Sequence, residues 1–219
     1  MDNKCRIGID VGGTFTDIVA VSDTGTVTFS KAASTPNDPS IGVMNAVDRL
    51  ADELGINSET LLSKTESIVH GTTVATNALL ERKGAKTGLL TTLGHRDVLE
   101  MREGLKDDRY NMRLPAPAPL VPRFLRLGVR ERIKPDGSIH TKLDNTSLDE
   151  AINKLREEKV TSVAVCYLHA YKEPKHEQET KQILEAKLPG VSVSISSEVF
   201  PEIKEYERVS TTVVNAYVR

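Results

Sequence analysis

Short apolar runs separated by glycine-rich breaks open the chain. Their β-branched residues predict strands over Cys5–Val11, Phe15–Val21 and Thr26–Ala32. The breaks between them, at Gly12-Gly13 and Asp23-Thr24-Gly25, have turn composition. Three strands joined by turns this short form an antiparallel meander.

Helical periodicity begins after the meander. A helix is expected over 38–55, with proline at its first position and glycine as its stop. A second helix over Thr72–Lys83 follows a short strand at Ser67–His70 and precedes a strand at Thr87–Thr92. This alternation of strands and helices predicts α/β units on a partly parallel sheet.

The alternation resumes after an irregular segment that contains four prolines between residues 115 and 122. The elements expected beyond it are hairpin strands at Leu127–Ile133 and Ser138–Leu143, a helix opened by a capping box at Ser147, a strand at Val160–Leu168, a helix at Pro174–Leu188 and a strand at Val191–Ile195. These elements predict a second α/β lobe.

We therefore expect an α/β fold of two lobes. The first spans 1–100, a proline-rich connection spans 101–122, the second lobe spans 123–200, and a helix starts within 201–219. That helix keeps apolar positions at Val209, Val213 and Val214 but reaches the last residue without a stop signal. We expect a truncated N-terminal part of a larger protein, with a C-terminal region missing.

Composition excludes several classes of function. The 219 residues carry 29 Lys+Arg against 31 Asp+Glu, a net charge of −2 that argues against nucleic-acid binding. Cys5 and Cys166 both lie in apolar runs, so no disulfide framework is expected. Free cysteines are typical of the reducing cytoplasm, where we expect the protein to be. No apolar run approaches the roughly 18 residues of a membrane span. We expect a cytoplasmic protein with neither nucleic acid nor membrane as partner.

One segment carries most of the candidate chemistry: Ile7-Gly-Ile-Asp-Val-Gly-Gly-Thr-Phe-Thr-Asp17. Its candidate ligand residues are Asp10, Gly12, Gly13, Thr14, Thr16 and Asp17. The glycines let backbone N–H groups approach an anion, and the threonines offer hydroxyls to phosphate oxygens. The aspartates, which we expect on buried strands, can hold Mg²⁺ through water. An ordinary type I′ or II′ hairpin would need the glycines alone, so the segment predicts a phosphate site.

The segment is neither a P-loop nor a dinucleotide fingerprint, because no Gly-Lys-Ser/Thr follows and GxGxxG is absent. It resembles the phosphate-binding hairpin of the superfamily that includes actin, sugar kinases and the heat-shock chaperone ATPases. The resemblance implies an actin-like, ribonuclease H-like lobe with a mixed sheet and ATP as its ligand. In that superfamily two related lobes close on ATP, and only the first glycine hairpin is present here.

A second segment, beginning His70-Gly-Thr-Thr, places hydroxyls at a helix start. Thr72 and Thr73 lie where free N–H groups favour an anion, and Asn77 is one turn beyond Thr73. His70 is a candidate base, because the ordinary pKa of histidine lies near neutrality. Two alternatives stay open: a threonine here simply caps the helix, and His70 ends a strand in a hydrogen bond.

Together with Gly94-His-Arg-Asp-Val-Leu99, His176-Glu177 and the closing segment 197–217, these motifs resemble the N-terminal region of the hydantoinase A and oxoprolinase family. The resemblance implies an ATP-dependent amidohydrolase of the N-methylhydantoinase or 5-oxoprolinase type, or a subunit of an acetone or acetophenone carboxylase. It implies ATP and Mg²⁺ as cofactors and a small cyclic amide or carbonyl compound as substrate. A hydantoinase B-type subunit is the implied partner.

The remaining ionisable residues do not form a recognisable site, and two other functions are alternatives. Pro174 separates His169 from His176, so no metal-binding helix face is expected, and Cys166 is expected in the core. Glu205 and Arg208 lie either on the solvated face at the start of a helix or at an interface or ligand contact. A small-molecule kinase and a nucleotide-binding module without turnover remain alternatives. With one of two phosphate hairpins, the chain alone is expected to be inactive.

Overall fold

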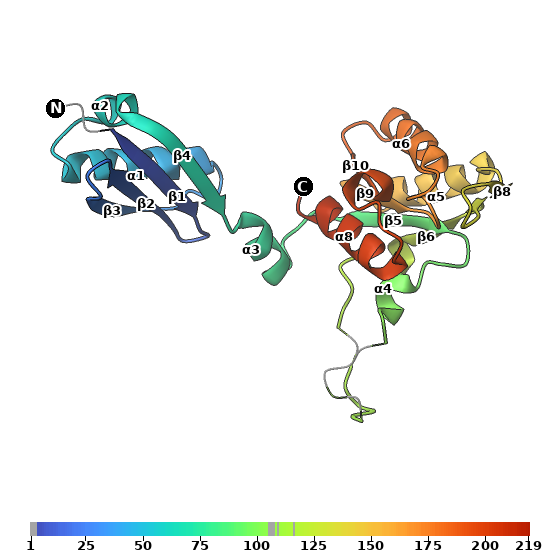
Figure 1. Ribbon diagram of the computed structural model, residues 1–219. Coiled ribbons are helices and arrows are strands. Elements are labelled where there is room, and N and C mark those ends of the chain that lie inside the picture. The colour runs from blue at the N-terminus through green and yellow to red at the C-terminus, as the bar shows by residue number, and fades with distance from the viewer. Residues whose placement is uncertain (1–3, 105–107, 109, 116) are drawn as a thin grey trace. The chain divides into compact units, whose positions relative to one another are not determined.

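The computed structural model describes residues 4–104, 108, 110–115 and 117–219. It separates two compact units, Met1–Glu81 and Arg82–Arg219, each with its own sheet (Figure 1). The division falls after Glu81 and not near residue 100, because β5 (Thr87–Thr92) pairs with strands of the second unit. Among the described residues, no helix has the length and apolar character needed to cross a membrane.

The first unit is a mixed sheet in the order β3-β2-β1-β4. Its strands are β1 (Cys5–Val11), β2 (Phe15–Ser22), β3 (Val27–Ala33) and β4 (Thr65–Thr72). The first three form the expected antiparallel meander, and β4 lies parallel to β1. This is the mixed sheet expected of an actin-like lobe, and it confirms the α/β fold class.

Helix α1 (Pro39–Glu53) covers one face of this sheet. The carboxylate of Asp38 caps it by accepting from the Ser40 N–H at 3.0 Å. Alternation along β1 buries Ile7 and Ile9 under the helix and turns Gly8 and Asp10 to the other face. Helices α2 (Ser58–Ser63) and α3 (Val74–Leu80) complete the unit.

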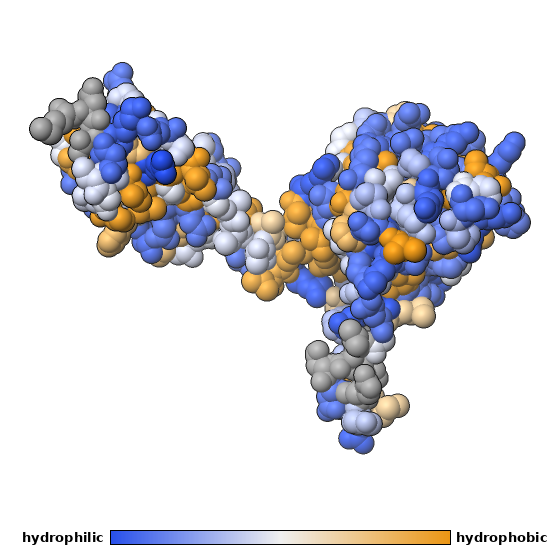
Figure 2. All heavy atoms as spheres, viewed as in Figure 1, coloured by the Kyte–Doolittle hydropathy of each residue, from blue (hydrophilic) through white to orange (hydrophobic). Residues whose placement is uncertain are grey.

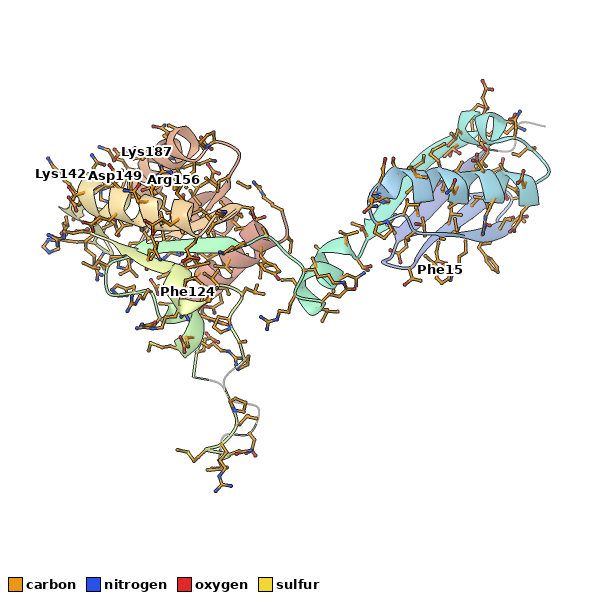
Figure 3. All side chains as sticks on the ribbon, turned by 180° about the vertical axis from the view of Figure 1, so that it is seen from behind. Phe15, Phe124, Lys142, Asp149, Arg156 and Lys187 are labelled. Atoms are coloured by element: carbon orange, nitrogen blue, oxygen red, sulfur yellow. The ribbon has the colours of Figure 1, made fainter. Side chains whose placement is uncertain are left out.

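The face of the sheet opposite α1 exposes apolar side chains among charged ones, and Figure 2 shows this mixture on the first unit. Phe15 is 47% exposed, Phe29 75% and Val69 70%. Phe15 stands beside the turn that joins β1 and β2, where Figure 3 labels it, and its ring lies 5.0 Å from Lys31 Nζ.

The second unit is an all-parallel sheet in the order β10-β9-β5-β6. Its other strands are β6 (Arg126–Val129), β9 (Ser162–Cys166) and β10 (Ser192–Ile195). The strand expected over 127–133 is split, because β6 joins this sheet while β7 (Arg132–Ile133) pairs with β8 (Ile139–Thr141). The hairpin is therefore shorter than expected.

Helices cover both faces of the parallel sheet. On one face lie α5 (Asn145–Glu157) and α6 (Lys175–Lys187), which are joined by an ion pair of 2.5 Å between Lys187 and Asp149 (Figure 3). On the other lies α8 (Glu205–Tyr217). The short helices are α4 (Val98–Met101), α7 (Ser196–Val199) and the 3-10 turn Arg123–Leu125. Asp144, and not the expected capping box at Ser147, caps α5: its carboxylate accepts from the Ser147 N–H at 3.0 Å.

Glu177 is a fully buried carboxyl that holds the ends of two strands together. It accepts from the Tyr167 N–H at 2.9 Å, the Ser197 N–H at 2.8 Å and the Ser196 hydroxyl at 2.6 Å. Burial raises the pKa of this carboxyl. The neighbouring residue of α6, Gln178, is exposed.

Glu177→Ala should lower the free energy of unfolding by about 2–4 kcal/mol, because two buried N–H groups lose their acceptor. Urea titration followed by circular dichroism measures the change. Gln178→Ala on the same helix is the control and should stay within about 0.5 kcal/mol of the parent. Equal stability of the two variants would contradict the role given to Glu177.

The two cysteines differ in their surroundings. Cys166 lies in the core, where burial raises the pKa of its thiol to about 12, whereas Cys5 is only half-buried. Iodoacetamide at pH 8 should therefore modify Cys5 in the folded protein and reach Cys166 only after unfolding in urea. Peptide mass spectrometry distinguishes the two sites. Rapid labelling of Cys166 in the folded protein would contradict the burial of its thiol.

Candidate functional site

The glycine turn between β1 and β2 is closed by a hydrogen bond from the Gly12 N–H to the Phe15 carbonyl at 2.9 Å. Neither Gly12 nor Gly13 has a positive φ, so the turn is not the ordinary hairpin type. Close approach explains the glycines instead. A Cβ on Gly12 would stand 3.0 Å from the Phe15 carbonyl oxygen, and a Cβ on Gly13 would stand 2.9 Å from Asn77 Nδ2.

The parallel pairing of β1 and β4 brings the two sequence motifs together. The Thr73 N–H donates to the Val11 carbonyl at 3.2 Å, directly before the turn. Asn77 projects from α3 toward Gly13 and lies 3.5 Å from the Thr73 hydroxyl. The carboxyl ends of the two strands therefore present Gly13, Thr14, Thr73 and Asn77 within one small region of the first unit.

Asp10 and Asp17 face each other across β1 and β2, in direct register. They lie on the face opposite α1 and are exposed, so the expectation that these carboxylates are buried is wrong. Each strand buries its alternate residues under the helix and turns its aspartate outward. Asp17 forms an ion pair with Lys31 at 3.0 Å, and a Cβ on Gly71 would lie 3.6 Å from Asp10 Oδ1.

Thr16 points into the protein, and this corrects the expectation that its hydroxyl meets phosphate. The side chain is fully buried, with Oγ1 at 3.1 Å from the Ser34 hydroxyl. Ser34 donates in turn to the Gly12 carbonyl at 2.8 Å, so the Thr16 hydroxyl is the donor to Ser34. Both residues hold the turn in place. Sequence reasoning missed Ser34, which follows β3 and carries no motif of its own.

Two residues of the second motif also depart from expectation. His70 pairs with Ile9 in the sheet and so shares the α1 side, whereas Asp10 and Asp17 lie on the other. His70 is exposed there and does not join the aspartates. Thr72 donates its hydroxyl proton to the Val11 carbonyl at 3.3 Å and accepts from the Val74 N–H at 3.2 Å. The Thr72 hydroxyl is thus used in local backbone contacts, whereas the cap position of α3 is Thr73, whose side chain makes no capping hydrogen bond.

A hollow of about 1010 Å³ lies beside the strands of the first unit and includes both aspartates in its lining. Lys31, Val69 and Gly71 also line it. Within the described part of the chain, no three His, Cys, Asp or Glu side chains gather as a metal site. Two facing carboxylates suffice for Mg²⁺ only when water and phosphate supply its other ligands. The arrangement suits a phosphate-bound cation better than a permanently held one.

Residues 6–188 match the family described as the hydantoinase/oxoprolinase N-terminal region. Among curated relatives, the caprolactamase alpha subunit of Pseudomonas jessenii is 44% identical over 97% of this chain and 31% of its own. The 5-oxoprolinase of Saccharomyces cerevisiae is 30% identical over 97% of this chain and 19% of its own. The chain thus spans less than a third of the length of these relatives.

Two solved structures have the same fold. The crystal structure of the ATP-dependent caprolactamase from Pseudomonas jessenii superposes with a TM-score of 0.85 over 97% of this chain and 31% of that one, at 44% identity. A nucleotide-free acetone carboxylase superposes with a TM-score of 0.90 over 99% of this chain and 32% of that one, at 27% identity. The expected family is confirmed: the chain belongs to the hydantoinase/oxoprolinase family and corresponds to its N-terminal region.

Proposed function

We propose that this chain contributes part of the ATP site of an ATP-dependent enzyme that hydrolyses a cyclic amide. The observation that carries the proposal is the meeting of the glycine turn with the start of α3 at the carboxyl ends of β1 and β4. Backbone N–H groups, exposed hydroxyls and two carboxylates surround this point. Those groups match the needs of a magnesium-bound phosphate chain.

Each residue has a defined task in this proposal. The N–H groups of Gly13 and Thr14 donate to phosphate oxygens, and Gly13 leaves room for their approach. The Thr14 and Thr73 hydroxyls are exposed and add donors. Asp10 and Asp17 hold Mg²⁺ through its waters, while Lys31 keeps Asp17 in position through their ion pair of 3.0 Å.

The relatives support a cyclic amide as the proposed substrate class. Caprolactam and 5-oxoproline are cyclic amides, and the relatives named for them match 97% of this chain.

In the proposed reaction the amide oxygen attacks the terminal phosphorus of ATP, and ADP leaves. Water then adds to the activated carbon, and the C–N bond breaks as the nitrogen takes a proton, which opens the ring to an acyl phosphate. Hydrolysis of that acyl phosphate releases the amino acid and inorganic phosphate. Turnover requires the remainder of the longer protein and a hydantoinase B-type subunit, so the chain alone should not hydrolyse ATP. The proposed location of the enzyme is the cytoplasm.

A second candidate is the corresponding subunit of a ketone carboxylase. The TM-score of 0.90 with acetone carboxylase favours it. ATP-dependent phosphate release by the complete protein with its partner subunit distinguishes the two functions. Release stimulated by caprolactam, hydantoin or 5-oxoproline supports the hydrolase, and release that needs acetone or acetophenone together with bicarbonate supports the carboxylase.

Gly13→Val tests the phosphate contact. ATP with Mg²⁺ should shift the amide NMR signals of Gly12, Thr14 and Thr73 in the parent chain. The variant should weaken this binding by at least about tenfold, or about 1.4 kcal/mol, because the branched side chain occupies the approach to the turn. Thr24→Val, in the turn at the other end of the sheet, should bind as the parent does. Unchanged shifts in a folded Gly13→Val protein would refute the contact.

Asp10→Asn tests the magnesium site in the same titration. The Mg²⁺ concentration that half-saturates ATP binding should rise by about tenfold, since hydrogen bonds to charged groups contribute roughly 1.5–3 kcal/mol. Asp23→Asn removes an equal charge from an exposed turn and is the matched control. If neither Asp10→Asn nor Asp17→Asn changes the Mg²⁺ requirement, these carboxylates do not hold the ion.

A further inference from the structure

The carboxyl edge of the parallel sheet in the second unit gathers ionisable residues that the proposed ATP site does not use. The chain passes from β5 to β6 on one side and later returns to β9 on the other, so the strand order reverses at β5. In open α/β sheets, ligands bind at such a reversal, beyond the carboxyl ends of the strands. The segments that leave β5 and β9 at this edge carry His95 and His169.

Arg208 lies beside this edge, in the first turns of α8, and is only 1% exposed. Its Nε and Nη1 are buried, and no residue that the structure describes accepts a hydrogen bond from either. The Glu205 carboxylate is 4.0 Å from Nη2, beyond hydrogen-bond distance. Two buried guanidinium nitrogens without acceptors are costly, so this side chain is suited to an anion that supplies them.

Two further polar atoms of this edge, His169 Nδ1 and Thr91 Oγ1, also lack partners among the described residues. The Arg208 guanidinium lies 5.5 Å from the Tyr171 ring, which lies 6.0 Å from the His169 ring. His169 Nδ1 is buried without a partner among the described residues, and its backbone has a φ of +57°. Non-glycine residues adopt that conformation at a cost, and such strain gathers at ligand sites. Thr91 Oγ1, in register with Cys166 beneath α8, is likewise unpaired within the described ranges.

The rim of this region is also positive. Arg132 Nη1 donates to His95 Nε2 at 3.0 Å, so that nitrogen carries no proton and the ring is neutral. Burial, and then the charge of Arg132, lower the pKa of His95. The nearby carboxylate of Glu131 is already engaged, because it lies 2.8 Å from His176 Nδ1 and accepts from Thr92. Each of the two Glu131 oxygens therefore already takes part in one hydrogen bond.

We infer that Arg208, His169 and Thr91, with Arg132 at the rim, bind an oxyanion at the carboxyl edge of the second unit. Arginine takes carboxylate and phosphate oxygens in the same geometry, and the unpaired nitrogen and hydroxyl add hydrogen bonds. His169 and Tyr171 are half-exposed, so the anion would reach the buried groups from solvent beside these two side chains. The anion is a carboxylate or a phosphoryl group of a small molecule, and none of the ATP-site residues takes part.

The test is a titration of the 219-residue chain with inorganic phosphate and, separately, with acetate, at ionic strength held constant with chloride. Imidazole NMR signals of His95 and His169 report on this edge alone, so binding at the glycine turn does not interfere. Saturable shifts with phosphate only identify a phosphoryl ligand, shifts with acetate only identify a carboxylate, and shifts with both establish the oxyanion site. No saturable shift with either anion overturns the inference.

Two variants connect the response to the named residues. His169→Gly removes the imidazole and relieves the positive φ, so it should fold, and the affinity measured at His95 should fall by at least fivefold. Lys159→Gly is the matched control, because it also removes a basic side chain from a residue with a positive φ, here +53°. Lys159 precedes β9 and therefore lies at the opposite, amino edge of the sheet. Arg208→Gln should abolish binding if it folds. Equal affinities for His169→Gly and Lys159→Gly would overturn the assignment.

Discussion

The parallel pairing of β4 with β1 is the constraint on which the candidate ATP site depends. It joins Asp10 to Gly71 and Val11 to Thr72 in register, across a chain separation of about sixty residues. Parallel strands end at the same edge, so the glycine turn and the start of α3 meet there. Without that pairing, each motif would be an isolated turn. With it, backbone donors, hydroxyls and the Asn77 amide surround one point.

The alternation of side chains in the same strands divides the polar residues between two faces. Asp10 and Asp17 turn away from α1, whereas Thr16 turns under it and stabilises the turn through Ser34. His70 falls on the α1 side because it is paired with Ile9. A shift of register by one residue would exchange these roles. The chemistry of the first unit is thus set by strand register as much as by residue type.

Buried ionisable groups at the carboxyl edge of the second unit's sheet differ in how many hydrogen-bond partners they have. Glu177 accepts three hydrogen bonds, and Glu131 is engaged by His176 and Thr92. These two carboxyls hold the carboxyl edge of the sheet together. Arg208, at the same edge, has no comparable set of partners in the described chain. Satisfied groups of this kind stabilise a fold, whereas an unsatisfied one calls for an explanation, which for Arg208 is the inferred oxyanion.

The sequence by itself determined most of the strands, the long helices, the antiparallel meander and the family, because each depends on local periodicity or on a contiguous motif. The strand expected over 127–133 is the exception, since it is divided between two sheets. It also placed Gly12, Gly13 and Asn77 among the candidate residues. Tertiary structure alone decided that β5 joins the second sheet, that the units divide after Glu81, and that Thr16 is buried while Asp10 is exposed. Those outcomes depend on pairing between distant strands and on which face a helix covers, and no local pattern encodes either.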